Sequence, residues 1–285
     1  MSDAQVPQEQ DDGAPTRSGE LVMRIVSAIV LGLAAVAAAW LGGLVFLAFW
    51  TAGALAVWWE WVGIMKAEPR PILVGIGAAA IAGMAVALAA DAAAFAFVCA
   101  VVGAGVAASS IQSSRGWILG GVAYAAAVLI PAVMLRNDPS LGFIAIVWLF
   151  AVVWAEDTGA YFTGRYFGGP KLAPAISPNK TWSGALGGTA AGVLAGNAVI
   201  LLAGITWHPA HLALAFAAVV AAQLGDLLES AIKRRFAVKD ASSLIPGHGG
   251  VMDRVDGFLV AATLALAVGL AHGGARTPAA GLLLW

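Results

Sequence analysis

Apolar runs about as long as a membrane is thick recur along this chain from Leu21 to its end. A helix needs ~20 apolar residues to cross the hydrocarbon core of a bilayer. The chain is 61% hydrophobic and only 11% charged, whereas soluble domains are roughly one quarter charged. Because the runs lack the period-two alternation of barrel strands, they are predicted to be helices. The sequence therefore predicts an all-α, polytopic integral membrane protein.

Nine of these runs are predicted to span the membrane. The fourth is short and rich in Ala and Gly, which makes it the weakest candidate. Residues 1–20 are polar and acidic and are expected to be disordered, so that 21–285 forms a single transmembrane domain. Residues 275–285 are too short to span and are expected at the outer interface. The nine predicted spans are 21–40, 43–65, 71–90, 92–108, 117–135, 141–163, 183–204, 209–232 and 255–272.

Positive charges divide unevenly between the two sides of the membrane if nine spans alternate in direction. Of the 15 Lys and Arg residues, all but Arg136 and Arg276 fall on the side of the amino terminus. Cytoplasmic loops carry the excess of Lys and Arg in membrane proteins. The amino terminus is therefore predicted to face the cytoplasm.

Charged residues gather on that same side, between Gly225 and Asp256. Within the eighth span, Asp226, Glu229, Ser230 and Lys233 are spaced i, i+3, i+4 and i+7, which places them on one helical face. Ionisable groups inside a span are costly unless paired or hydrated, so they predict a functional site. The alternative is a structural network between Asp226 and Lys233 that holds helices together.

Two further carboxylates, Asp253 and Asp256, lie one turn apart where the ninth span begins. Together with Asp226 on the preceding helix, they predict a nest of oxygen ligands for a hard cation. Mg²⁺ favours one or two carboxylates combined with phosphate oxygens of a substrate. Capping of the helix by Asp253 is an alternative that is compatible with this role. No Cys or His cluster has the spacing of a zinc site.

The loop between these carboxylates is basic and then rich in glycine. Four cations lie between Lys233 and Lys239, and a PGHGG turn follows at 246–250. Glycines let backbone N–H groups approach an anion, and adjacent cations neutralise a polyphosphate. A basic cytoplasmic loop alone is more often a topology signal, but its position between carboxylates favours a binding site.

A second polar segment occupies 154–184, around the sixth and seventh spans. Asp157 lies in or near the sixth span, and an SPNKTW motif places Ser177, Asn179 and Lys180 before the seventh. These groups are suitable donors for a phosphate or a nucleotide. Ser-Pro-Asn is also ordinary turn chemistry, so the motif is weak by itself.

The seventh span carries a glycine at every fourth position, at 184, 188, 192 and 196. This spacing predicts a flat helix face for close packing against a neighbouring helix or subunit. The single cysteine, Cys99, lies in an apolar run and excludes an internal disulfide.

The segment SAIKRRFAVKDASSLIPGHGGVMDRVD, from Ser230 to Asp256, resembles the signature of the phosphatidate cytidylyltransferases. The segments WAEDTGAYFTGRYFG and KLAPAISPNKTWSGALGG are also similar to that family. The close resemblance covers roughly 150–260, and the earlier spans match only as apolar helices. Glu156 departs from the pattern, because a small residue is expected before Asp157.

The resemblance implies a multi-pass enzyme of the bacterial inner membrane, with its active site facing the cytoplasm. It implies that CTP and phosphatidic acid give CDP-diacylglycerol and pyrophosphate, with Mg²⁺ and a second, monovalent cation such as K⁺ as cofactors. It also implies a homodimer among membrane lipids, and we expect no nucleic-acid partner. It implies that Asp226, Asp253 and Asp256 are catalytic and bind the metal, and that Lys233 is also catalytic. The residues that it implies for substrate binding are Ser177, Asn179, Lys180, Arg234, Lys239, His248, Gly249, Gly250 and Arg254.

The expected mechanism is in-line attack of a phosphatidate oxygen on the α-phosphorus of CTP, at a Mg²⁺–carboxylate centre. The main barrier is the approach of two anions, which metal and cationic side chains relieve. Two rivals stay open. A secondary transporter would place its charged groups at the midplane of two related halves, and a CTP-dependent lipid kinase would transfer the γ-phosphoryl group.

Overall fold

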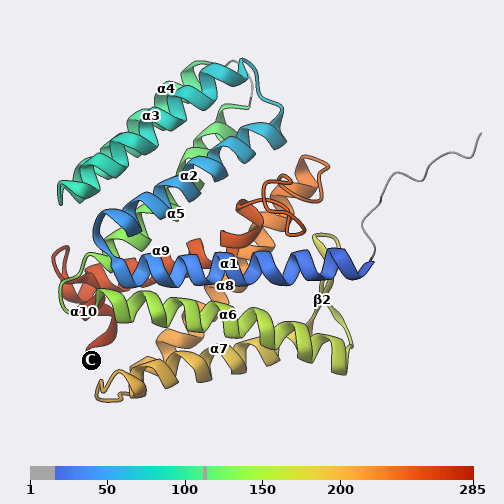
Figure 1. The fold of residues 1–285 in the computed structure, drawn as a ribbon, viewed down its shortest axis with the longest axis vertical. Coiled ribbons are helices and arrows are strands. Elements are labelled where there is room, and N and C mark those ends of the chain that lie inside the picture. Colours follow the sequence, from blue (N-terminus) through green and yellow to red (C-terminus); the bar gives the residue numbers. More distant parts are fainter. Residues whose placement is uncertain (1–16, 112–113) are drawn as a thin grey trace, which may run out of the picture.

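The computed structural model describes residues 17–111 and 114–285, which form a bundle of long helices with one small hairpin (Figure 1). In those residues the elements are α1 (Arg17–Leu41), α2 (Gly43–Met65), α3 (Arg70–Ala89), α4 (Ala93–Ser109), α5 (Arg115–Arg136), α6 (Gly142–Phe167), β1 (Lys171–Ala173), β2 (Ser177–Thr181), α7 (Trp182–Leu202), α8 (Ala210–Arg235), α9 (Met252–Gly273) and α10 (Pro278–Leu283).

Each of the nine predicted spans coincides with one helix. The largest differences are at Arg17 and Phe167, which extend α1 and α6 four residues beyond the predicted limits at 21 and 163. Within the described residues, eight helices are long and apolar enough to cross a membrane. The ninth, α4, has 17 residues, or roughly 26 Å of helix. The prediction of an all-helical, polytopic membrane protein is confirmed, and the fourth span is the short one.

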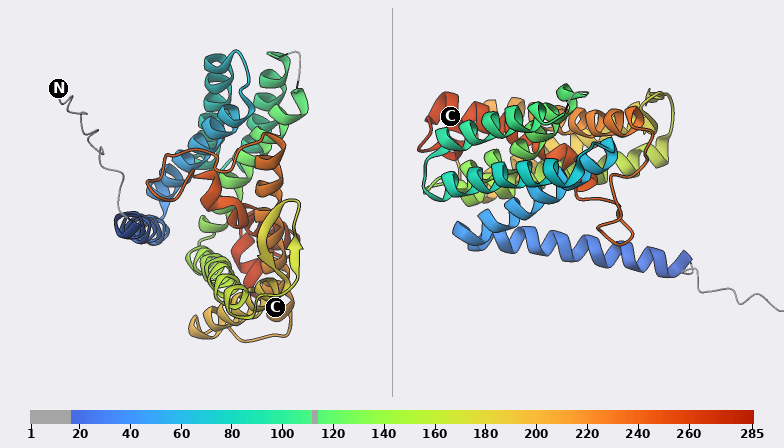
Figure 2. Two further views of the ribbon diagram at one scale, coloured as in Figure 1. Left: turned by 90° about the vertical axis from the view of Figure 1, so that its right-hand side faces the viewer. Right: turned by 90° about the horizontal axis from the view of Figure 1, so that it is seen from above.

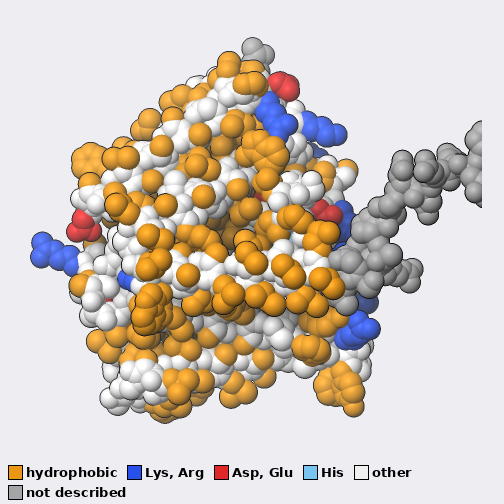
Figure 3. All heavy atoms as spheres, viewed as in Figure 1, with side chains coloured by type: hydrophobic (Ala, Val, Ile, Leu, Met, Phe, Trp, Pro, Cys, Tyr) orange, Lys and Arg blue, Asp and Glu red, His pale blue; other side chains and the backbone are white. Residues whose placement is uncertain are grey.

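The helices pack as neighbouring groups rather than as one ring (Figures 1 and 2). Helices α2 to α5 pack against one another, α6 packs along α7, and α8 packs along α9. Helix α9 also contacts α5 and α10, so it lies at the centre of the molecule. Helix α1 lies across one face and is mostly exposed. Apolar side chains cover that face broadly, and Lys and Arg side chains lie toward its two ends (Figure 3). This is the surface expected of a protein surrounded by lipid.

The glycine stripe of α7 packs directly on α6, as the spacing predicts. A Cβ atom at Gly188 would lie 2.7 Å from the Glu156 carbonyl oxygen, and one at Gly192 would lie 2.9 Å from that of Val152. The two backbones therefore touch along their length, and a side chain at these positions would separate them.

The start of α1 differs from the predicted boundary. Helix α1 begins at Arg17, within the tail that was expected to be disordered to residue 20, and residues 1–16 lie outside the described part of the chain. Residues 275–285 were expected at the outer interface, and in the structure Leu282 and Leu283 of α10 are fully buried within the protein; the position of α10 relative to the membrane stays a prediction. The Ala280 N–H donates to Asp138 Oδ2 at 2.9 Å, which anchors α10 beneath the α5–α6 turn.

The strands β1 and β2 form the one two-stranded sheet of the described residues. They pair antiparallel, with Lys171 opposite Thr181 and Ala173 opposite Ser177. Thr181 ends the hairpin and starts α7, because its Oγ1 accepts a hydrogen bond from the Gly184 N–H at 3.1 Å. The hairpin thus holds the SPNKTW motif in a defined shape at the end of α6 and α7.

Candidate active site

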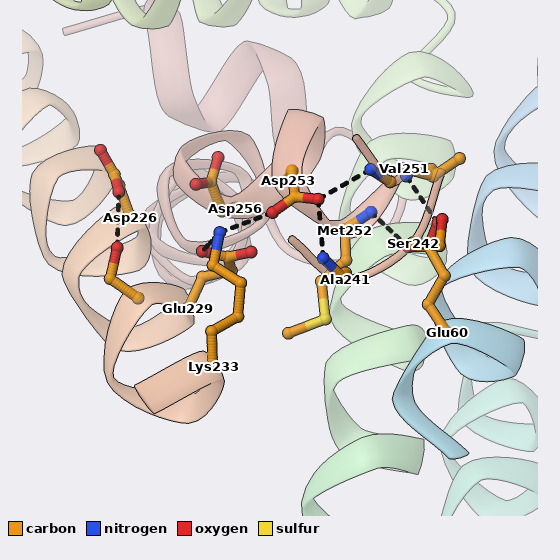
Figure 4. A network of polar contacts seen from close by, with 12 residues as sticks. Glu60, Asp226, Glu229, Lys233, Ala241, Ser242, Val251, Met252, Asp253 and Asp256 are labelled. Carbon is orange, nitrogen blue, oxygen red and sulfur yellow. Dashed lines mark hydrogen bonds and ion pairs between the residues drawn. The ribbon is translucent and has the colours of Figure 1, made fainter. Parts of the chain in front are cut away.

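The end of α8, the loop 236–251 and the start of α9 form one polar network, shown in Figure 4. On α8, the four residues predicted to share a face do so. Ser230 Oγ lies 3.4 Å from Asp226 Oδ1, and Lys233 Nζ lies 2.7 Å from Glu229 Oε2. The i, i+3, i+4, i+7 spacing therefore places these groups together inside the membrane-spanning helix.

Lys233 joins α8 to α9. Its Nζ lies 2.5 Å from Asp253 Oδ1 as well as contacting Glu229, whose side chain is 1% exposed. This half-buried cation between two carboxylates holds both helices in register, and removing one partner would leave an uncompensated charge. The sequence left open a structural network between Asp226 and Lys233. In the structure Lys233 contacts Glu229 and Asp253 instead, and Asp226 pairs with Lys180.

Asp253 also organises the loop that precedes it. Its Oδ2 accepts hydrogen bonds from the Gly250 N–H at 2.7 Å and the Ala241 N–H at 3.0 Å. The carboxylate lies in the first turn of α9, where a negative charge is favoured by the helix dipole. With Lys233 on the other oxygen, Asp253 has three contacts within the protein.

Glu60 of α2 is a member of this network that the sequence analysis missed. It is 1% exposed, and its Oε1 accepts from Ser242 Oγ at 2.6 Å and from the Val251 N–H at 2.8 Å. Its Oε2 accepts from the Met252 N–H at 2.7 Å. Glu60 thus binds the free N–H groups at the start of α9. A single carboxylate inside an apolar span was the signal that could have identified it.

The glycines of the PGHGG turn allow these carboxylates to come close. Gly249 has φ +80°, which favours glycine, and a Cβ there would lie 2.9 Å from Asp253 Oδ2. A Cβ at Gly250 would lie 2.6 Å from Glu60 Oε1. The anions that this backbone approaches in the structure are side chains of the protein itself. The assignment of Gly249 and Gly250 to substrate binding stays a prediction.

His248, at the centre of the same turn, contacts the first helix. Its Nδ1 lies 2.6 Å from Ser27 Oγ of α1. Burial, followed by the charges of Arg254 and Arg24, lowers the pKa of His248 below its usual range. The imidazole is therefore neutral at pH 7, and it would meet a phosphate by hydrogen bonding rather than as a cation.

The hairpin brings the SPNKTW motif to the same site. Lys180 of β2 forms an ion pair with Asp226 of α8. Arg234 Nε donates to the Ile176 carbonyl oxygen at 3.2 Å, so the end of α8 is tied to the hairpin turn. Ser177 and Asn179 lie on the opposite face of β2 from Lys180, because strand side chains alternate. Lys180 therefore joins the carboxylate cluster, and the assignment of Ser177 and Asn179 to substrate binding stays a prediction.

The two other predicted cations are exposed. Lys239 lies in the loop after α8, and Arg254 lies in the first turn of α9. Both are on the side of the molecule that carries the network, so they are accessible to an anionic ligand. Their assignment to substrate binding stays a prediction.

Glu156 has a definite position, although its role was open from the sequence. Its Oε1 accepts from Gln223 Nε2 of α8 at 3.1 Å. Gln223 also reaches the Ala185 carbonyl oxygen of α7 at 3.0 Å. Glu156 therefore ties α6 to α7 and α8, behind Lys180 and Asp226.

The carboxylates of the network have the chemistry of Mg²⁺ ligands. Across residues 17–111 and 114–285, no group of three or more His, Cys, Asp or Glu side chains is arranged to hold a metal ion by itself. Asp226 and Asp256 face each other from α8 and α9 and interact electrostatically (Figure 4). Mg²⁺ is commonly bound by one or two carboxylates and completed by substrate phosphates and water. The donor set fits that pattern.

Known proteins resemble this chain along most of its length. A family model described as "Cytidylyltransferase family" matches residues 22–271. A Brucella suis protein named "Phosphatidate cytidylyltransferase" is 41% identical over 248 residues, which are 86% of this chain and 91% of that protein. A Brucella abortus protein of the same name is 42% identical over the same shares. A Haemophilus influenzae protein, also so named, is 44% identical over 130 residues, 44% of this chain and 45% of its own.

The matched residues 22–271 include every helix that contributes to the network, from Ser27 on α1 to Asp256 on α9. The match therefore extends well beyond the segment 150–260 that carries the close sequence resemblance. The chain belongs to the phosphatidate cytidylyltransferase family of membrane enzymes.

Proposed function

We propose that the protein transfers the cytidylyl group of CTP to phosphatidate, giving CDP-diacylglycerol and pyrophosphate. The observation that carries this proposal is the family match across residues 22–271, which contains all of the carboxylates and cations of the site. Relatives that share 41% identity over 86% of the chain bear the name of that activity.

The proposed reaction is a direct displacement. A phosphate oxygen of phosphatidate forms a bond to the α-phosphorus of CTP, and the bond from that phosphorus to the bridging oxygen breaks. The electron pair leaves with pyrophosphate. The attacking oxygen is already an anion, so no general base is required. The energetic problem is the approach of negative charges, which fixed cations relieve.

Cations of the chain surround the place where these charges would meet. Lys180 and Arg234 lie at the hairpin side of α8, and the exposed Lys239 and Arg254 lie at the loop side. Lys233 is already engaged by two carboxylates. We therefore infer that Lys233 positions α8 and α9, while the exposed cations bind the phosphates.

Asp226, Asp253 and Asp256 are the residues proposed to hold Mg²⁺. Asp226 and Asp256 are the more available of the three, because Asp253 already contacts Lys233 and two backbone N–H groups. When bound, the metal would neutralise phosphate charge and polarise the α-phosphoryl group. Lys180 would then exchange its contact with Asp226 for a phosphate oxygen. A second, monovalent cation such as K⁺ beside this site, and a homodimeric assembly, are also part of the proposal.

We propose that the site faces the cytoplasm, where CTP is available. The distribution of Lys and Arg supports this orientation, because all but Arg136 and Arg276 lie on the side of the network.

The test is a product analysis with labelled CTP and phosphatidate, using the full chain in mixed micelles. A cytidylyltransferase transfers label from the α-phosphorus of CTP into the lipid and releases label from the γ-phosphorus as pyrophosphate. A lipid kinase would transfer the γ-label instead, and a transporter would transfer neither. Either of these last two results would overturn the proposal.

A further inference from the structure

Helix α1 meets the loop 236–251 at one place, and the proposed reaction gives this contact no role. From Val22 to Val30, every residue of α1 except Ser27 is exposed. Figure 2 shows the loop between α8 and α9 extending away from the bundle to reach α1. The contact around Ser27 is therefore where this half of the helix can act on the site.

The loop meets α1 through a tight turn. The His248 N–H donates to the Ile245 carbonyl oxygen at 2.9 Å, and the Ile245 N–H donates to the Gly249 carbonyl oxygen at 2.8 Å. Pro246 and Gly247 occupy the two central positions, and Gly247 has φ +76°, as type II turns prefer. Backbone hydrogen bonds therefore hold the turn and fix where the His248 side chain begins.

Three successive residues of this turn contact α1. Ser27 Oγ lies 3.1 Å from the Pro246 carbonyl oxygen and 2.6 Å from His248 Nδ1. A Cβ at Gly247 would lie 3.0 Å from the Cγ atom of Arg24, so a larger residue there would push the turn away from the helix. The turn is thus packed directly on α1.

The Ser27 hydroxyl has more neighbouring acceptors than it has protons. Besides Pro246 and His248, the Met23 carbonyl oxygen lies 2.8 Å from Ser27 Oγ, and that of Arg24 lies 3.2 Å away. A serine hydroxyl has one proton to donate. The contact with His248 Nδ1, at 2.6 Å, is the shortest of the four. Its length favours donation from the hydroxyl to Nδ1.

The direction of this hydrogen bond decides what the other ring nitrogen of His248 can do. In a neutral imidazole, one nitrogen carries the proton and the other accepts. If Ser27 donates to Nδ1, the proton lies on Nε2, which can then donate to an anion. If Nδ1 donates to Ser27 instead, Nε2 presents a lone pair and repels an anion. Within residues 17–111 and 114–285, no protein group bonds to Nε2, so it is available to a ligand.

Two arginines make the surroundings of His248 attractive to an anion. Arg24 of α1 and Arg254 of α9 both act on the imidazole through their charges. Both arginines are exposed, and no ion pair among the described residues engages either of them. Two such cations beside a ring N–H donor have the chemistry that binds a phosphate. A donor at Nε2 therefore suits this position better than an acceptor.

We propose that Ser27 is a positioning residue of the site. Its hydroxyl donates to His248 Nδ1 and so holds the imidazole with Nε2–H available to a substrate phosphate beside Arg24 and Arg254. This inference rests on the proposed function for the identity of that phosphate, which belongs to CTP or to phosphatidate. Ser27 lies outside the segments that resemble the family signature, and it acts through His248 rather than on the substrate.

The first measurement is the protonated nitrogen of His248, read from the NMR shifts of ¹⁵N-labelled histidine. The full-length protein is used in detergent, with pyrophosphate as the probe and without CTP. His248→Gln identifies the signals of this ring among those of the four histidines. The unsubstituted protein should carry the proton on Nε2. In Ser27→Ala the Pro246 carbonyl oxygen is the acceptor that still interacts with the ring, so the proton should move to Nδ1.

The second measurement is the affinity of the same proteins for pyrophosphate, by calorimetry. Ser27→Ala should weaken binding roughly five-fold, as expected for one hydrogen bond, and Ser27→Thr, which keeps the hydroxyl, should restore it. Ser109→Ala is the matched control, because this hydroxyl bonds to the Val106 carbonyl oxygen of its own helix at 2.8 Å, and its affinity should be unchanged. In a His248→Gln background, Ser27→Ala should have no further effect, because Ser27 acts through the ring.

Activity assays identify the source of the phosphate. Ser27→Ala should raise KM for CTP if the phosphate belongs to the nucleotide, and KM for phosphatidate if it belongs to the lipid.

Four results would overturn the inference about Ser27. They are a proton on His248 Nδ1 in the unsubstituted protein with pyrophosphate, no binding of pyrophosphate by that protein, an unchanged affinity in Ser27→Ala, and an effect of Ser27→Ala that persists in the His248→Gln background. The last result would make the role of Ser27 merely structural. A protein that shows the expected protonation and affinities but forms no CDP-diacylglycerol would contradict the proposed function alone.

Discussion

At the residue scale, the site depends on carboxylates with different duties. Glu60 and Asp253 bind backbone N–H groups of the loop and of α9, whereas Asp226 and Asp256 face each other with fewer protein contacts (Figure 4). The first two shape the site, and the second two are available to a ligand. Substitutions in the two classes should therefore have different effects on stability and on turnover.

Glu60→Gln should lower activity through the loop rather than through the chemistry. The amide keeps the size of the side chain, but its NH₂ group must face an N–H donor at the start of α9. A lost charge-assisted hydrogen bond is worth about 2 kcal/mol. We expect a lower unfolding midpoint and a raised KM for CTP, with a smaller change in kcat. Ser242→Ala is the control, because it removes only the side-chain contact and should have the milder effect.

Asp256→Asn should reduce the turnover rate about 100-fold or more, with little loss of stability. Its Oδ1 accepts only the local Gly257 N–H within the described chain, so the fold does not depend on its charge. Asp253→Asn should also inactivate the enzyme but should lower the unfolding midpoint, because it breaks the contact with Lys233. Steady-state assays over a range of Mg²⁺ concentrations, with unfolding curves, separate the two. Equal stability losses in both variants would contradict this division.

At the element scale, close helix contacts carry the site. Helices α6 and α7 approach through glycines, and Thr181 starts α7 where the hairpin ends, which places Lys180 beside α8. The β1–β2 hairpin is short, but it is the part of the segment 154–184 that brings Lys180 into contact with Asp226 of α8.

Gly188→Ala should destabilise the protein, because the added Cβ would lie 2.7 Å from the Glu156 carbonyl oxygen. Overpacking of this kind costs about 1–3 kcal/mol. Gly75→Ala on α3 is the matched control, since nothing lies within 4 Å of its added Cβ, and alanine is the better helix former. Thermal unfolding in detergent should show a lower midpoint for the first variant alone. A similar midpoint for both would contradict the packing argument.

Asp138 anchors α10 on the side opposite the site, and its effect should depend on pH. Burial opposes its charge, but hydrogen bonds from Ser140, Ala280 and Leu141 prevail and lower the pKa of Asp138 below its usual range. Its contribution is therefore complete above its unfolded pKa of about 3.9 and is lost as pH falls through the lower folded value. The stability difference between the unsubstituted protein and Asp138→Asn should be constant above pH ~5 and shrink in more acid buffer. Unfolding curves measured across pH test this, and a difference that grows in acid would refute it.

At the scale of the whole molecule, the network connects helices from both ends of the chain. Ser27 on α1, Glu60 on α2 and Asp253 on α9 all contact the loop 236–251 or its ends. The region that resembles the family signature is therefore not an independent unit, and its loop is shaped by helices that the motifs do not include.

The proposed orientation predicts which loops react with a reagent that cannot cross the membrane. In a Cys99→Ser background, Ser243→Cys in the site loop should be labelled by an impermeant maleimide only in inside-out vesicles. Ala275→Cys, on the opposite side, should be labelled only in right-side-out vesicles. Both positions are exposed. The reverse pattern would place the site outside the cytoplasm.

Much of the fold followed from the sequence because its causes are local. Nine apolar runs of suitable length predicted the helices α1 to α9, and helical spacing placed Asp226 and Lys233 on one face. Glycine spacing identified the packing face of α7. These features depend on the periodicity of one helix and on the cost of exposing its backbone to lipid.

What the sequence by itself determined is thus the class of protein, the helices and the type of chemistry on one side of the membrane. Only the tertiary structure decided which charges pair. It joined Lys180 to Asp226 and Lys233 to Asp253, and it placed Glu60 against the start of α9. The reason is that pairing depends on contacts between helices far apart in the chain. Spacing within one helix cannot specify which side chain of another helix will meet it.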